Sequence, residues 1–269
     1  MKKIDTLVDE YIAKGFTIDQ ARNFIAQQIL LTKIEKSIYV DKVLLKGGVV
    51  MYNMTHELRR TTSDLDIDFI RYNILEKKNI IDFIKIIDKN DFDYHLKVIE
   101  EIKDLHQQNY KGKRVVLLIS DNYDSTPIKF KIDIGIHTLL AIKQNKMCFF
   151  FDNDKELSLW VNPPEQIFAE KLFSLAKLGP ITERYKDIDD MYYLITQIEM
   201  DIITIRDCLE LLIIGNRYHI KDVADIITKA DYCLNNSVFI NNYLNRKGSW
   251  IDIDYNYKKK TILDFVDKF

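Results

Sequence analysis

Two aspartates and a pair of glycines form the part of this sequence with the clearest chemical potential. Asp64 and Asp66 are separated by one residue inside an apolar run, and Gly47 and Gly48 precede them. Residues i and i+2 of a β-strand project on the same face, so the two carboxylates would point together. Because buried like charges repel, a hard divalent cation that prefers oxygen ligands would stabilise the pair, and Mg2+ is the first candidate. The glycines would let backbone N–H groups approach a phosphate, so the segment predicts metal-assisted phosphate chemistry.

A third carboxylate is expected from the alternating segment 128–137, whose isoleucines form one face of a strand. Asp133 stands on the other, polar face. If this strand neighbours that of Asp64, three carboxylates converge, as two-metal catalysis requires. An ordinary exposed aspartate is an equally good interpretation of Asp133, and Asp68, on the face of Asp64, is a competing third ligand.

Four blocks of sequence stand in an informative order and spacing. They are Leu45–Gly48, Arg60–Asp66, Ala169–Leu172 and Arg184–Asp190. With these blocks the chain resembles the AbiEii/AbiGii toxin family of the DNA polymerase β-like nucleotidyltransferase superfamily. Many members of that superfamily carry Gly-Ser where this chain has Gly47-Gly48, so backbone contacts must carry more of the phosphate binding here.

The resemblance implies transfer of a nucleoside monophosphate from an NTP to an acceptor hydroxyl, at a two-metal Mg2+ site. The implied catalytic residues are Asp64, Asp66, Asp133, Lys171 and Asp187, of which the first three would be the metal ligands. The implied nucleotide contacts are Lys46, Gly47, Gly48, Arg60, Thr62, Lys171 and Asp190.

The charged residues of the last two blocks also have ordinary structural interpretations. Lys171 lies in an apolar helical setting, where a lysine commonly extends its ammonium group to water. Asp187 and Asp190 share a helix face and can pair with the nearby Arg184. Asp189 points elsewhere and is expected to be solvated.

Two basic segments are candidate RNA contacts. Arg59 and Arg60 precede the carboxylate strand and can reach a phosphate, although a solvated turn is the alternative. The segment 245–260 interleaves basic and aromatic residues, as single-stranded RNA platforms do. Aromatic residues in such a segment more often pack on a helical domain, and lysine runs are usually solvated.

Bulk composition limits the classes of partner and compartment. The 269 residues carry a net charge of −2, so any nucleic-acid surface must be a local patch. Three widely spaced cysteines with no zinc-site spacing favour a reducing, cytoplasmic setting. The N-terminus lacks the apolar core of a signal peptide, and no apolar run approaches the ~18 residues of a membrane span.

Hydrophobic patterning predicts an α/β chain with a mixed sheet domain at 1–155, of nucleotidyltransferase type by the resemblance, and an all-helical C-terminal domain at 156–269. The predicted strands are 43–45, 65–70, 94–103, 114–119 and 128–137. The predicted helices are 18–38, 47–54, 75–89, 164–178, 184–198, 203–213 and 219–232.

The resemblance also implies a biological role. The chain would be the toxin of a bacterial toxin–antitoxin or phage-abortive-infection pair, with an NTP substrate, RNA such as tRNA as acceptor, and a separately encoded antitoxin. Two alternatives stay open. One is aminoglycoside-type transfer to a small molecule, which needs an acidic pocket for a cationic drug. The other is a degenerate module that only binds nucleotide or a partner protein, an interpretation favoured by the missing serine.

Overall fold

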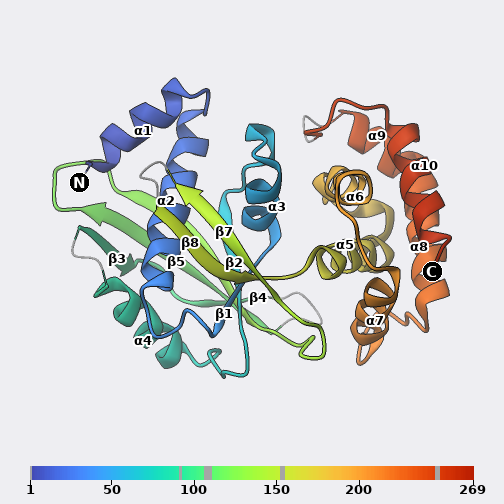
Figure 1. Cartoon of the computed structure of the whole chain (residues 1–269), viewed down its shortest axis with the longest axis horizontal. Coiled ribbons are helices and arrows are strands. Elements are labelled where there is room, and N and C mark those ends of the chain that lie inside the picture. Colours follow the sequence, from blue (N-terminus) through green and yellow to red (C-terminus); the bar gives the residue numbers. More distant parts are fainter. Residues whose placement is uncertain (1, 91–92, 106–110, 152–154, 246–248) are drawn as a thin grey trace. The chain divides into compact units, whose positions relative to one another are not determined.

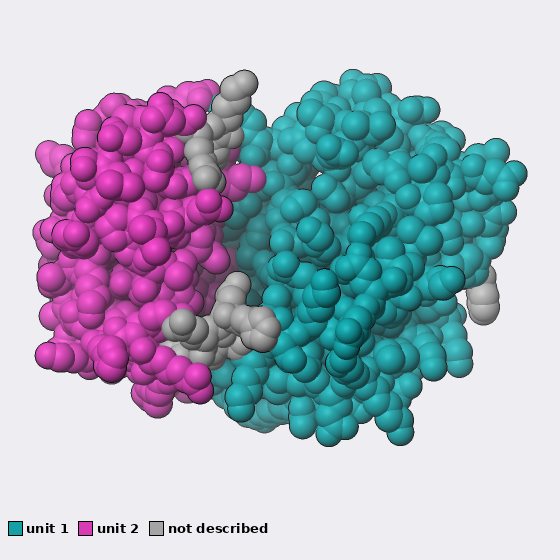
Figure 2. All heavy atoms as spheres, turned by 180° about the vertical axis from the view of Figure 1, so that it is seen from behind, with its two compact units in different colours: residues 1–140, 144–162 teal, residues 141–143, 163–269 magenta. Residues whose placement is uncertain are grey.

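The computed structural model describes residues 2–90, 93–105, 111–151, 155–245 and 249–269 (Figure 1). The chain divides into two compact units, coloured separately in Figure 2. The sheet unit comprises Met1–Leu140 and Gln144–Asn162, and the helical unit comprises Ala141–Lys143 and Pro163–Phe269. The division along the chain thus falls at 162, whereas the predicted boundary is at 155.

The described residues of the sheet unit form one mixed, eight-stranded sheet. Its strands are β1 (Val43–Lys46), β2 (Asp64–Phe69), β3 (Tyr94–Val98), β4 (Lys103–Leu105), β5 (Gly112–Asp121), β6 (Ile128–Ile136), β7 (Asn145–Phe151) and β8 (Lys155–Val161). The strand order is β3-β5-β6-β2-β1-β8-β7, with β4 also paired to β5. β2 runs parallel to β6 and β1 parallel to β8, while the other pairs are antiparallel.

The helical elements of the sheet unit are α1 (Ile4–Ala13), α2 (Ile18–Glu35), α3 (Gly47–Thr55), the 3-10 turn η1 (Leu58–Arg60) and α4 (Lys77–Asp88). In this unit, α2 packs on β2, β6 and β8, and α1 packs on α2. α2 begins at a capping box, in which Thr17 and Gln20 satisfy each other's backbone N–H groups. α3 follows β1 directly and starts at the glycine pair.

Alternation of apolar and polar residues separates the two faces of β2 and β6. On β2, Leu65, Ile67 and Phe69 are fully buried, and the ring of Phe69 lies 5.1 Å from that of Phe83 on α4. The aspartates of β2 therefore project on the face opposite to α4. This arrangement keeps the polar face of the strand available for chemistry.

The helical unit contains α5 (Pro164–Leu178), the 3-10 turn η2 (Gly179–Ile181), α6 (Lys186–Gln197), α7 (Ile202–Ile213), α8 (Val223–Asn235), α9 (Ser237–Asn245) and α10 (Tyr255–Val266). Pro164 occupies the first turn of α5, where its missing N–H costs no hydrogen bond. α5 packs against α7 and α8, and α10 packs against α6. Among the described residues, no helix combines the length and the apolar character needed to cross a membrane.

The predicted elements are confirmed in type and position, with ends that shift by a few residues. The predicted strand 94–103 is instead two separate strands, β3 and β4, which both pair with β5. Three helices, α1, α9 and α10, and two strands, β7 and β8, were not predicted. β8 pairs with β1, so the sheet continues past residue 155.

Candidate active site

One row of charged residues crosses five neighbouring strands on the same face of the sheet. The register places Lys46 of β1 beside Asp66 of β2, and Asp66 beside Asp133 of β6. Asp133 in turn lies beside Arg114 of β5, which lies beside Lys103 of β4. The neighbour relation on which the third carboxylate depended is therefore present, because β6 is the parallel partner of β2.

The glycine pair packs directly against the two carboxylates of β2. Gly47 has a left-handed backbone, with φ of 65°, and a Cβ there would collide with the carboxylate of Asp66. A Cβ on Gly48 would lie 2.6 Å from Cβ of Thr62. Thr62 Oγ1 in turn donates a hydrogen bond of 2.7 Å to Asp64. A side chain at either glycine would therefore clash with its neighbour. Gly47 adjoins Asp66 directly, and Gly48 adjoins Asp64 through Thr62.

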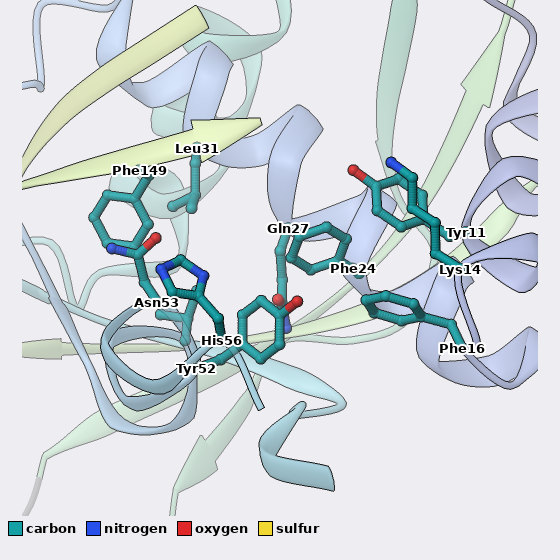
Figure 3. A pocket seen from close by; sticks show the side chains of 11 residues that line it. Tyr11, Lys14, Phe16, Phe24, Gln27, Leu31, Tyr52, Asn53, His56 and Phe149 are labelled. Atoms are coloured by element: carbon teal, nitrogen blue, oxygen red, sulfur yellow. The ribbon is translucent and has the colours of Figure 1, made fainter. Parts of the chain in front are cut away.

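The loop that leads into β2 is held from behind by α2. Gln27 Nε2 donates to the carbonyl oxygens of Thr62 and Asp64, at 3.0 and 3.3 Å. Gln27 also lines a cavity of about 210 Å³ whose walls include aromatic residues such as Phe24 and Tyr52 (Figure 3). The cavity wall and the carboxylate loop thus share one side chain.

Asp133 is held by a basic residue that the sequence analysis did not identify. Arg114 donates from Nε and Nη2 to the two carboxylate oxygens of Asp133, at 2.7 and 2.6 Å. This hydrogen bonding raises the pKa of Arg114 above its ordinary value, and the negative charges of Asp64 and Asp66 raise it further. The guanidinium therefore interacts electrostatically with all three candidate metal ligands.

Asp68, the competing third ligand, has a cation of its own. It is buried, and Lys46 Nζ lies 3.0 Å from its Oδ2. Lys46, a predicted nucleotide contact, is thus ion-paired with Asp68 on the same polar face as the Asp-x-Asp pair.

The donor set suits a hard cation at Asp64 and Asp66, but the third carboxylate is oriented otherwise. Asp64 and Asp66 are half-buried and project on the same face, which fits oxygen ligation of Mg2+. Across the described ranges, no three His, Cys, Asp or Glu side chains lie close enough to form a metal cage. The three carboxylates occupy neighbouring positions without converging, because Arg114 holds Asp133.

The two arginines before β2 differ in environment. Arg60, a predicted nucleotide contact, is only 4% exposed, so the solvated-turn interpretation is wrong for this residue. Arg59 is exposed and its Nε lies 3.4 Å from Glu57. Of the two, Arg59 is the one on the surface.

In the helical unit, Lys171 lies at the centre of a buried ion cluster. Its Nζ donates to Asp187 at 2.7 Å and to Asp190 at 2.6 Å. Arg184 Nε donates to the other oxygen of Asp187 at 2.6 Å. Burial raises the pKa of Asp187, but Lys171 and Arg184 outweigh it and hold the pKa well below its ordinary value. The Lys171 side chain does not extend to water, since it is only 5% exposed.

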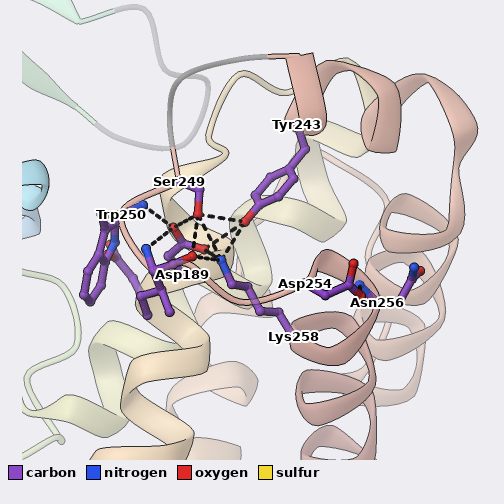
Figure 4. Close-up of polar contacts among 9 residues, drawn as sticks. Asp189, Tyr243, Ser249, Trp250, Asp254, Asn256 and Lys258 are labelled. Atoms are coloured by element: carbon purple, nitrogen blue, oxygen red, sulfur yellow. Dashed lines mark hydrogen bonds and ion pairs between the residues drawn. The ribbon is translucent and has the colours of Figure 1, made fainter.

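The expectation that Asp189 is solvated is wrong. Asp189 is 0% exposed and accepts hydrogen bonds from Lys258, Tyr243 and several groups of the segment 249–251 (Figure 4). Lys258 is also fully buried, and its Nζ lies 2.6 Å from Asp189. A carboxylate can be buried at this position because a full set of donors surrounds it.

The basic and aromatic C-terminal segment mainly completes the helical unit. Trp250 and Tyr255 are buried, and Trp250 Nε1 donates to Asp190 at 3.0 Å. Tyr257 remains exposed, whereas Arg246 and Lys247 lie outside the described residues. The prediction that aromatic residues here pack on the helical domain is confirmed for Trp250 and Tyr255.

Two residues that sequence reasoning missed support the site from neighbouring elements. Arg114 begins an apolar run in β5, so only its pairing register with β6 shows that it meets Asp133. Gln27 is a buried polar residue on the inward face of α2. A polar residue in an apolar stripe needs a hydrogen-bond partner, so its position in the sequence could have indicated a structural role.

Three solved structures are similar to this chain, and the first of them supports the fold. JHP933 from Helicobacter pylori superposes with a TM-score of 0.50 at 11% identity, covering 94% of this chain and 92% of that chain. A putative nucleotidyltransferase from H. pylori gives 0.45 at 12% identity, covering 90% of each chain. An antigenic nucleotidyltransferase-like protein from Paracoccidioides brasiliensis gives 0.45 at 13% identity, covering 68% of this chain and 82% of that chain.

A family comparison identifies the chain at the level of sequence. No curated protein matches it. The family model described as nucleotidyl transferase AbiEii toxin, type IV toxin–antitoxin system, matches residues 28–232. This range is more than half of the chain and contains the glycine pair, the Asp-x-Asp strand and the ion cluster of Lys171. The chain is therefore a nucleotidyltransferase that belongs to the AbiEii toxin family of type IV toxin–antitoxin systems.

Proposed function

We propose that the protein transfers a nucleoside monophosphate from an NTP to a hydroxyl group of RNA, with Mg2+ bound by Asp64 and Asp66. The observation that carries this proposal is the contact between the glycine pair and the carboxylate pair. Gly47 adjoins Asp66, and Gly48 adjoins Thr62, which bonds Asp64. A phosphate-binding turn and a cation-binding pair are thus built as one local structure.

Each part of this local structure has a chemical task. Asp64 and Asp66 bind the cation, which neutralises the triphosphate and stabilises charge on the pyrophosphate that leaves. Backbone N–H groups at the start of α3 orient the phosphates, because the first N–H groups of a helix have no intrahelical acceptor. Thr62 and Gln27 keep the carboxylate loop in place through the hydrogen bonds described above.

The nucleotide-contacting roles of Lys171, Asp187 and Asp190 are also part of the proposal. Lys171 Nζ already donates to both aspartates, so contact with a phosphate would use its third N–H or exchange a carboxylate oxygen for a phosphate oxygen. Replacing Lys171 by Ala would leave two buried carboxylates short of a cation. A binding role for Lys171 must therefore be measured as NTP affinity in folded protein, since turnover alone would also report loss of structure.

A basic surface extends from the carboxylates over the same face of the sheet and favours RNA as acceptor. Lys131 lies in register beside Asp64, and Lys129 projects on the same side of β6. Lys97 of β3 is in register with Leu118 of β5, which is in register with Lys129. These lysines are exposed. They suit a chain of phosphates that leads to the metal site.

The acidic residues Glu100 and Glu101 lie near these cations. Lys129 Nζ lies 2.5 Å from Glu100. The hydrogen bond from Lys129 lowers the pKa of Glu100, and the charges of Lys103 and Lys131 lower it further, so these three lysines are close together. We refer to Lys97, Lys103, Lys129 and Lys131 as the basic face. A cationic aminoglycoside would be repelled by this surface, which disfavours the small-molecule alternative.

The acceptor class is tested by nucleotidyl transfer. The protein is incubated with each α-phosphate-labelled NTP, total RNA and Mg2+, beside the Asp64→Asn variant. We expect label on an RNA species with wild type alone. Labelling of an added aminoglycoside, with unlabelled RNA, would contradict the RNA acceptor while preserving the enzyme.

The basic face is tested by the salt dependence of RNA binding. The variant set is K97Q, K129Q and K131Q combined. The matched control is K78Q, K85Q and K89Q, three exposed lysines on α4 and its C-terminal end, beyond the opposite face of the sheet. Because each phosphate contact contributes about 0.7 to the slope of log K against log salt for single strands, we expect the slope to fall by about 2 in the first set only. Equal slopes in both sets would contradict this surface.

The biological proposal is a toxin acting in the bacterial cytoplasm, as part of a phage-defence pair with a separately encoded antitoxin. It is supported by family membership and by the cytoplasmic location of its proposed substrates, NTP and RNA. Expression of wild type should arrest bacterial growth, and matched expression of Asp64→Asn should not. Equal toxicity of both proteins would show that the harm does not depend on nucleotidyl transfer.

A further inference from the structure

The ion pair between Arg114 and Asp133 is placed where a two-metal site would need a free carboxylate. Both oxygens of Asp133 accept hydrogen bonds from one guanidinium, at 2.7 and 2.6 Å. The Asp133 side chain is 10% exposed and that of Arg114 is 38% exposed. The pair is thus a bidentate bridge between β5 and β6 on the polar face of the sheet.

The cation beside Asp133 is permanent. An arginine stays protonated at every pH at which the protein is folded, so no change of pH releases Asp133. The bidentate geometry also matches the planar carboxylate, which makes this one of the stronger ion-pair arrangements in proteins. Mg2+ gives up its water ligands reluctantly. A second Mg2+ would have to lose water and displace the guanidinium together.

The electrostatic surroundings point the same way. Arg114 interacts with Asp64 and Asp66 as well as with Asp133. Its positive charge therefore offsets part of the negative charge of the three carboxylates. Before nucleotide binds, one divalent cation between Asp64 and Asp66 would balance the remaining charge. A second would then leave Arg114 beside an excess of positive charge.

We propose that Arg114 takes the place of the second metal ion, so that the site binds one divalent cation through Asp64 and Asp66 and keeps Asp133 paired with arginine. Arg114 is then a positioning residue that acts through Asp133. It fixes this carboxylate near the acceptor and supplies a positive charge that does not exchange with solvent. The inference rests on the proposed function, because it assumes that Asp64 and Asp66 bind a divalent cation.

The test counts bound Mn2+ by electron paramagnetic resonance, with saturating non-hydrolysable NTP analogue. We expect one Mn2+ per chain for wild type and two for Arg114→Gln, because the variant frees both oxygens of Asp133. Lys103→Gln is the matched control, since it removes the neighbouring cation in register with Arg114 and should keep one Mn2+. Two Mn2+ in wild type, or one in a folded Arg114→Gln, would overturn the inference.

A second variant tests the same point without altering Arg114. Asp133→Asn should lower the affinity for the single Mn2+ by no more than the 10–100-fold that neighbours of metal ligands typically cost, because Asp133 is not a ligand in our proposal. A loss of more than about 100-fold would identify Asp133 as a ligand and overturn the inference. Absence of Mn2+ from wild type would instead contradict the proposed function, together with the inference that rests on it.

Discussion

Both units contain clustered aspartates, but these aspartates differ in their burial and in the groups that balance their charge. In the helical unit, Asp187, Asp189 and Asp190 are buried, and lysine, arginine or tryptophan side chains donate to each of them. In the sheet unit, Asp64 and Asp66 are only half-buried. The same residue type is thus used for internal structure in one unit and for an accessible polar face in the other.

The difference shows how a binding carboxylate can be separated from a structural one. Burying a carboxylate is costly unless charged partners and hydrogen-bond donors surround it, as they surround Asp189. A half-buried carboxylate beside a glycine turn keeps access to ligands from solution. Asp133 lies between these extremes, because it is buried but adjoins the open pair and bonds to the half-exposed Arg114.

The largest effect is expected on activity in the sheet unit. Asp64→Asn or Asp66→Asn should reduce nucleotidyl transfer by about a thousandfold or more, because the bound cation supplies several kcal/mol of transition-state stabilisation. Without Mg2+, the unfolding temperature should hold or rise, since one of two repelling charges is removed. Full activity in either variant would contradict the assignment of Asp64 and Asp66 as binding carboxylates, and with it the contrast with the structural aspartates of the helical unit.

The next effect concerns stability in the helical unit. Lys258→Met should lower the free energy of unfolding by about 3–5 kcal/mol, because it removes the ammonium partner of the buried Asp189. Lys260→Met, an exposed lysine two residues along α10, is the control and should change stability by less than about 0.5 kcal/mol. Denaturant unfolding is followed by Trp250 fluorescence, in a Trp160→Phe background. Equal effects of the two variants would contradict a structural role for this network.

Local patterns predicted the parts of the site that lie close in sequence. Alternation of apolar residues gives β6 and its polar Asp133, and the Asp-x-Asp spacing gives the shared face of Asp64 and Asp66. The glycine pair could be linked to them because only a short helix and turn intervene. These features depend on backbone geometry of a few residues, which a sequence displays directly.

Partners that are distant in sequence could not be predicted in this way. Asp189 meets Tyr243 and Lys258 across 54 and 69 residues, so its surroundings depend on how helices pack. Lys258 was hidden in a run of three lysines, although its spacing from the buried Ile262 indicates an inward helix face. Arg114 meets Asp133 only through the register of β5 and β6.

A smaller effect is expected when the serine common in the superfamily is introduced. Gly48→Ser should destabilise the protein by about 1–3 kcal/mol and lower activity, because its Cβ would collide with Thr62. Adding Thr62→Ala to Gly48→Ser should recover part of the lost stability relative to the single variant, since it removes two of the three clashing atoms, Oγ1 and Cγ2, while Cβ of residue 62 remains. Thr62→Ala alone is the reference for loss of the hydrogen bond to Asp64. Higher activity in Gly48→Ser would show that the glycine block is not packed as described.

The smallest effect is a pH dependence that arises from the ion cluster of Lys171 in the helical unit. The pKa of Asp187 is lowered in the folded protein, so this residue contributes stability above its unfolded pKa of ~3.9. That contribution is lost as pH falls toward the folded pKa, with a slope of at most about 1.4 kcal/mol per pH unit. Asp187→Asn should therefore show a shallower loss of stability than wild type below pH ~4, as measured by Trp250 fluorescence in the Trp160→Phe background.

The control Asp264→Asn, at an exposed position of α10, should keep the wild-type slope. If Asp187→Asn and wild type lose stability in parallel, the ion cluster of Lys171 does not stabilise the folded unit, and its cations are available for another task.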